Sequence, residues 1–151
     1  MRRQGRDLAV GVVGTALLLA GCAYGPSSAD HRAPENLSDA LDEAASGLQV
    51  ATLVVRLVAQ DRTTTPVADV TLRDALADVG GAYDTVARDV PPLPQQAARE
   101  RALAAVGDAT SAVADARAWV NDVSPSTGEQ IEAALADAAD AVESATAGLG
   151  G

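Results

Sequence analysis

Apolar residues recur along most of the chain at intervals of three and four, the spacing of one face of an α-helix. Four segments show this pattern, and no segment alternates apolar and polar residues as a half-buried strand would. The positions that we expect to face a common core are, in chain order, Leu41, Ala44, Leu48, Ala51, Val55 and Val58; Leu72, Leu76, Val79, Tyr83, Val86 and Val90; Ala102, Val106, Ala109, Val113, Ala116 and Val120; and Ile131, Leu135, Ala138, Val142, Ala145 and Leu149.

Polar capping residues and prolines mark where these helices begin and end. The caps that we expect are Asn36 paired with Asp39, Thr65 followed by Pro66 in the first turn, and Ser126 paired with Glu129. The run from Pro91 to Pro94 ends the second helix, because a residue before proline resists the helical conformation. Four amphipathic helices joined by short loops predict an all-α fold, an up-down antiparallel four-helix bundle over residues 36–151.

The first residues have a different character from the rest of the chain. Three arginines, at positions 2, 3 and 6, precede an apolar run of 13 residues, Leu8–Ala20. A membrane-spanning helix needs about 20 apolar residues, so this run is short for a transmembrane segment and typical of a secretory signal peptide. It ends in Leu19-Ala20-Gly21-Cys22, which resembles the lipobox of bacterial lipoproteins.

This resemblance covers the N-terminal segment alone. It implies that diacylglycerol is attached to Cys22 through a thioether and that residues 1–21 are a signal peptide cleaved before the cysteine. Two acyl chains are sufficient for stable anchoring at the outer face of the cell membrane, or in the outer membrane of a cell that has two. The alternative is an uncleaved signal anchor with a free cysteine. Sec export is expected, since Arg2-Arg3 is not followed by the apolar pair of a twin-arginine signal.

Residues 22–35 are polar, interrupted by proline and without periodicity, so we expect them to form a lipidated flexible tether. The formal net charge of −10 opposes binding to nucleic acid and to anionic lipid headgroups. Contact with the membrane is therefore expected only through the lipid.

The sequence offers little for catalysis or for binding a metal. The one histidine, His31, lies in the expected tether, so the folded domain lacks the base that a nucleophile would need. Five carboxylates fall on outward positions of the last two helices, and without a calcium-loop pattern we expect a solvated acidic face; they are Asp108, Asp115, Asp137, Asp140 and Glu143. We therefore predict no enzymatic activity, no metal and no cofactor beyond the covalent lipid. Gly80-Gly81, inside the second helix, suggests close approach of a neighbouring helix or a slight kink, with a hinge as the alternative.

The second half of the first helix is apolar over a wider arc than a bundle requires. Val50, Leu53, Val54 and Leu57 form a strip beside the core positions, and Trp119 is expected at the same end of the bundle. The strip is covered either from within the chain or by a protein partner or a second copy. Our hypothesis is a non-enzymatic interaction or scaffold module. The alternative is a carrier of a small apolar ligand in a cavity between the first helix and Trp119.

Overall fold

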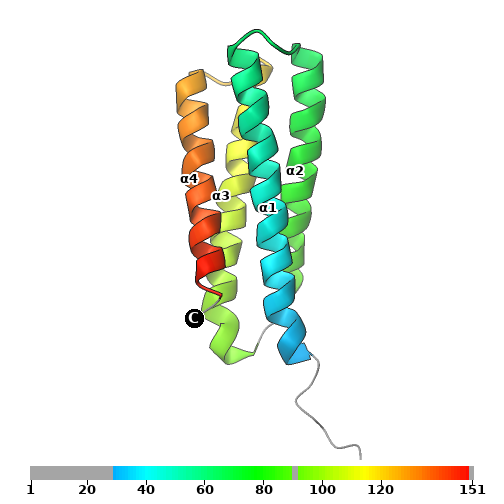
Figure 1. Ribbon diagram of the computed structural model, residues 1–151, viewed down its shortest axis with the longest axis vertical. Helices are drawn as coiled ribbons and strands as arrows, with labels where there is room; N and C mark the ends of the chain where they lie inside the picture. Colours follow the sequence, from blue (N-terminus) through cyan, green and yellow to red (C-terminus); the bar gives the residue numbers. More distant parts are fainter. Residues whose placement is uncertain (1–28, 90–91, 150–151) are drawn as a thin grey trace, which may run out of the picture.

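The computed structural model describes residues 29–89 and 92–149, and these form a bundle of four helices (Figure 1). The helices are α1 (Ala29–Ala59), α2 (Thr65–Arg88), α3 (Gln96–Val120) and α4 (Gly128–Ala147), with a short 3₁₀ helix, η1 (Leu93–Gln95), leading into α3. Successive helices run antiparallel, so the predicted all-α, up-down four-helix bundle is confirmed.

Helix α1 contacts each of the other three helices. Around the bundle each helix packs against the next, and α4 closes the ring against α1. One diagonal is also in contact: α1 touches α3, whereas α2 and α4 do not meet within the described residues. Alanines explain the short diagonal, since Ala44 and Ala51 of α1 and five alanines of α3 lie in the core and allow the helix axes to approach closely.

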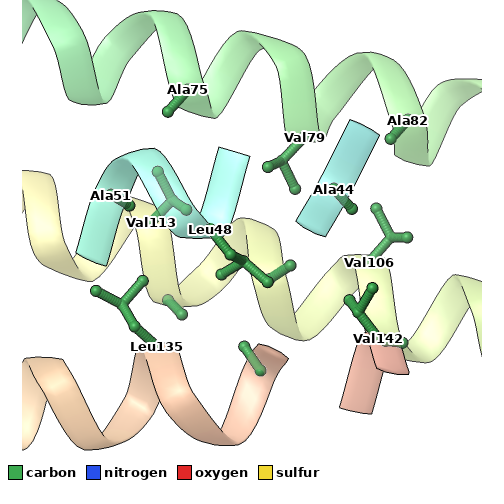
Figure 2. Close-up of a cluster of buried hydrophobic side chains, with 14 of the residues drawn as sticks. Ala44, Leu48, Ala51, Ala75, Val79, Ala82, Val106, Val113, Leu135 and Val142 are labelled. Atoms are coloured by element: carbon green, nitrogen blue, oxygen red, sulfur yellow. The ribbon is translucent and has the colours of Figure 1, made fainter. Parts of the chain in front are cut away.

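The core of the described residues is wholly apolar, with no buried polar or charged side chain. Figure 2 shows side chains from all four helices converging, with Leu48 of α1 near the centre. Of the expected core positions, Tyr83 is an exception at 42% exposed, because its hydroxyl needs water at the edge of the bundle. Val90 lies outside the described residues.

The start of α1 corrects the expected boundary between tether and domain. The helix begins at Ala29 rather than after Asn36, so residues 29–35 are helical and Asn36 lies inside the helix instead of capping it. Pro34 does not break the helix: near a helix start it removes only one hydrogen bond, and the alanines and arginine near it are good helix formers. Residues 1–28, which include the expected signal peptide and Cys22, lie outside the described residues.

Two other caps are displaced by one residue from the expected positions. Thr64, not Thr65, is the N-cap of α2, and its side chain makes no capping hydrogen bond. At α4, Thr127 and Gln130 form the capping box: the Gln130 amide donates to the Thr127 hydroxyl at 3.3 Å, and the Thr127 amide donates to Gln130 Oε1 at 2.8 Å. A hydroxyl residue is followed three positions later by Glu or Gln at both Ser126 and Thr127, so the sequence allows either capping box. The Ser126 amide is used in a turn, where it donates to Ser124 Oγ.

Helices α1 and α2 approach each other closely at Gly47, a residue that the sequence pattern does not single out. A Cβ at this position would lie 2.6 Å from Val79 Cγ2 and 3.2 Å from the carbonyl oxygen of Ala75. A Cβ added at Gly80 would have no neighbouring atom within 4 Å, and one added at Gly81 would have Glu43 Oε1 as its nearest neighbour, at 3.9 Å. The expected close approach at Gly80-Gly81 is therefore wrong, and the helices meet at Gly47 instead.

Substituting these glycines with alanine should have opposite effects on the free energy of unfolding. Gly47→Ala should lower it by about 1–3 kcal/mol, because the added methyl overpacks the contact with α2. Gly80→Ala should raise it by about 0.5–1 kcal/mol, since alanine favours the helix and the site is open. Urea unfolding of the two variants beside the wild type measures both values, and changes of the same sign would contradict the assignment.

Candidate interaction surface

The outer side of the C-terminal half of α1 carries the apolar strip expected from the sequence, with one change. Val50 is 38% and Leu53 58% exposed, and Leu57 is half-buried. Val54 is only 6% exposed and belongs to the core, so its placement on the surface was wrong. Val54 lies two helical turns beyond Gly47, so it is on the side of α1 that packs against α2.

Helix α2 extends this surface with two valines that the sequence pattern missed. Val67 is 59% and Val70 46% exposed, and both lie in the first two turns of α2. Counting along the antiparallel helices from the contact of Gly47 with α2 brings Leu57 level with Val67. We refer to these residues together as the α1–α2 apolar surface, which comprises Val50, Leu53, Leu57, Val67 and Val70.

Trp119 does not complete this surface. Its side chain is half-buried, packs against the core and lies over Gly128 of α4, where an added Cβ would be 3.2 Å from Cζ2 of the indole. The contact identified for Trp119 is thus with the start of α4, inside the monomer. A large aromatic ring at the end of the bundle covers core atoms that the alanine-rich helices leave uncovered.

A shallow groove runs along the other side of Leu53, between α1 and α4. Its volume is about 240 Å³, and its lining comes from α1 and from Ala139 of α4, without Trp119. Arg56 spans the two helices there, with its Nε 3.8 Å from Glu132 Oε2, and both side chains are largely exposed. A cavity was expected between the first helix and Trp119. The groove beside Leu53 does not include Trp119, so it is not that cavity.

Three of the five expected acidic residues lie together at a groove between α3 and α4. Asp108, Asp115 and Asp137 border a groove of about 270 Å³ whose floor contains Ala112 and Ala138. All three carboxylates are exposed, as are the remaining two of the five, Asp140 and Glu143. In residues 29–89 and 92–149 no three His, Cys, Asp or Glu side chains come together as metal ligands would.

An ion pair fixes the part of α2 that carries the two exposed valines. Arg117 Nε donates to Asp69 Oδ1 at 2.7 Å, and Asn121 Nδ2 donates to the same oxygen at 2.8 Å. The hydrogen bond from Arg117, followed by that from Asn121, lowers the pKa of Asp69 below its usual 3.8. At the other end of α2, Arg99 of α3 donates to the carbonyl oxygens of Val86 and Ala87. Helix α2 is thus tied to α3 at both ends while its outer side stays free.

The lowered pKa of Asp69 predicts how stability depends on pH. A carboxylate whose pKa is lower in the folded state stabilises the protein above its unfolded pKa, here about 3.8, and this contribution is lost as the pH falls through the folded pKa. Asp69→Asn should therefore be less stable than the wild type at pH 7, with a gap that narrows as the pH falls below about 4. Urea unfolding at several pH values measures the gap. Arg117→Gln removes the first donor to Asp69, and the difference in stability between this variant and the wild type should narrow in the same way. A difference that does not depend on pH would contradict the assignment.

Neighbouring substitutions in α1 should separate the core from the surface. Val54→Ser should lower the free energy of unfolding by about 2–4 kcal/mol, because it loses buried apolar area and buries a hydroxyl. Leu53→Ser, one residue away, should change it by no more than about 0.5 kcal/mol. Thermal and urea unfolding provide the comparison, and equal losses would mean that Leu53 is also covered.

Among the residues that the structure describes, no helix combines the length and apolar character needed to cross a membrane. No family model matches the sequence, and neither a similar curated protein nor a similar solved structure was found.

Proposed function

We propose that this protein is a lipid-anchored, non-enzymatic interaction or scaffold module at the outer face of the cell membrane, or of the outer membrane where the cell has two. The α1–α2 apolar surface carries the proposal. Soluble proteins expose single apolar residues routinely, whereas a group of large ones on two adjacent helices is typical of a surface that binds a partner. The occupant is a protein partner or a second copy of the chain.

The position of the surface suits a protein held at its N-terminus. The anchor is Cys22, in the lipobox, and α1 begins at Ala29. Val50 and Leu57 lie 21 and 28 residues further along the helix, which at 1.5 Å per residue is about 30–40 Å from its start. A partner can therefore reach the α1–α2 apolar surface without approaching the lipid. The acidic composition supports a protein rather than nucleic acid as this partner.

The chemistry of the chain supports a binding role over catalysis. The one histidine is His31, in the first turns of α1, and the one cysteine is Cys22, which the lipid modifies in this proposal. Acid–base catalysis needs a positioned group near a substrate, and the ion pairs of Asp69 and of Arg56 join helices instead. The carrier alternative has less support, since the groove beside Leu53 is shallow and does not reach Trp119.

Site-specific photocross-linking in cells tests the anchor and the surface together. A photoreactive phenylalanine analogue at position 53 of the full-length chain should give adducts of discrete mass, because Leu53 is the most exposed α1 residue of the surface. The same analogue at Asp137, an exposed position on α4, is the matched control and should give none. Cys22→Ser should leave an uncleaved precursor that takes up no labelled acyl chain.

The two parts of the proposal fail separately. A Cys22→Ser chain that is still processed and labelled would overturn the anchor. Equal cross-linking from positions 53 and 137 would overturn the interaction surface and leave the anchor intact. An adduct of twice the chain mass would identify a second copy as the occupant. Val50→Asp in the chain carrying the analogue at position 53 should abolish the specific adduct without unfolding the bundle, since Val50 is itself exposed.

A further inference from the structure

The outer side of α2 changes from apolar to acidic along its length. The spacing of three and four that joins Val67 to Val70 continues to Asp74 and Asp78, so these four residues lie along one side of the helix. All four side chains are exposed. Two carboxylates therefore follow directly on the two valines of the α1–α2 apolar surface.

Helix α1 changes in the same way. Leu57, Val50 and Glu43 are seven residues apart, which is close to two full turns, so they lie along one side of α1. Leu57 is half-buried, and Val50 and Glu43 are exposed. Because α1 and α2 are antiparallel neighbours, the apolar part of each helix lies at the same end of the bundle (Figure 1).

Two contacts fix how the two helices are aligned. Glu43 Oε1 lies 3.9 Å from the position that a Cβ on Gly81 would take, so the Glu43 side chain reaches α2. Gly47 makes the other contact with α2. Counting along the antiparallel helices from either contact brings Val50 level with Asp74. The carboxylates of both helices thus continue the α1–α2 apolar surface, and we call Glu43, Asp74 and Asp78 its acidic extension.

The acidic extension has no positive partner among the described residues. Its three side chains are exposed, and the ion pairs within 4 Å involve other carboxylates. In a chain with a formal net charge of −10, exposed carboxylates alone indicate only a solvated surface. These three differ because they continue an exposed apolar surface on the same two helices. An occupant of the whole surface needs an apolar part and a basic part.

The surface and its extension together have the length of a short helix. Leu57 and Glu43 are 14 residues apart on α1, which at 1.5 Å per residue is about 21 Å. A partner helix of about four turns covers this length. Laying one side of an amphipathic helix against neighbouring helices is a common mode of recognition between proteins.

Charge selects among the possible occupants. A second copy carries the same acidic extension, so a parallel pair would bring like charges together. A fully overlapping antiparallel pair would cover the apolar residues of each copy with the carboxylates of the other, which loses apolar contact. Lysine or arginine side chains of a different protein meet the acidic extension with opposite charge.

We propose that the occupant is an amphipathic helix of a partner protein whose docking side is apolar in one half and basic in the other. Its apolar half covers Leu53, Leu57 and Val67, and its lysines or arginines face Asp74 and Asp78. This inference rests on the proposed function and gives the partner of the α1–α2 apolar surface its chemistry. The charges also fix the direction of the helix, since only one direction places its basic half over the acidic extension.

Fluorescence anisotropy with a designed peptide tests the inference. The full-length chain is held in nanodiscs of zwitterionic lipid, and empty discs give the blank. The probe is a fluorescein-labelled stapled helix of about 18 residues, with leucines along one side of its first half and arginines along the same side of its second half. Its affinity for the wild type should fall at least fivefold in the double variant Asp74→Asn, Asp78→Asn and in Leu53→Ser. The matched control Asp137→Asn, Asp140→Asn removes the same charge from exposed positions of α4 and should bind as the wild type does.

Two control peptides test whether the arrangement of the charges matters, and not only their sum. One carries the arginines on the side opposite the leucines and should bind the wild type at least fivefold more weakly. The other has glutamate in place of arginine and should not bind. Circular dichroism on each protein variant checks that the bundle is folded.

Cross-linking in cells from position 53 separates failure of this inference from failure of the proposed function. Adding Asp74→Asn and Asp78→Asn should reduce the specific adduct at least fivefold, whereas Asp137→Asn with Asp140→Asn should leave it unchanged. An adduct that persists in full would overturn the basic partner and leave the interaction surface intact. No specific adduct from the wild type would overturn the surface itself.

Three other results would also overturn the inference. One is the absence of saturable binding of the probe above that of empty discs. Another is equal affinity for the probe and for the peptide with its arginines on the opposite side. The third is an adduct of twice the chain mass, which would make a second copy the occupant.

Discussion

The contact between Gly47 of α1 and Val79 of α2 is the constraint on which the exposed side of the bundle depends. A glycine there allows the α1 backbone to approach the side chain and backbone of α2 more closely than any other residue would. This approach sets the relative register of the two antiparallel helices. It places Val54 on the side of α1 that packs against α2, and it brings Leu57 of α1 level with the exposed Val67 of α2.

The polar interactions follow from a core that admits only apolar side chains. Because the described interior holds no buried polar residue, every ion pair and side-chain hydrogen bond lies at its margin. Those at Asp69 and Arg99 tie α2 to α3 at its two ends and hold the outer side of α2 in place without occupying it. Three carboxylates, Asp108, Asp115 and Asp137, border the groove between α3 and α4.

Small residues account for both the close packing and the two concave features of the fold. Alanines in α1 and α3 allow these two diagonally opposite helices to come into contact. Small side chains also leave shallow grooves at the surface, between α3 and α4 and between α1 and α4. The hollow lined by Leu37, Gln95, Arg101 and Leu149 lies instead at the end of the bundle, where η1, the start of α3 and the residues after α4 meet the early part of α1 and the regular packing of the helices stops.

The sequence by itself determined the four helices and nearly all of the core, because a spacing of three and four fixes which face of each helix is buried. It also determined that the second half of α1 is too apolar for a single core face. Only the tertiary structure decided that Val54 is buried while Leu53 is exposed, and that Gly47 rather than Gly80 is needed for packing. Those outcomes depend on the angle and register of the neighbouring helix, which a local periodicity does not encode.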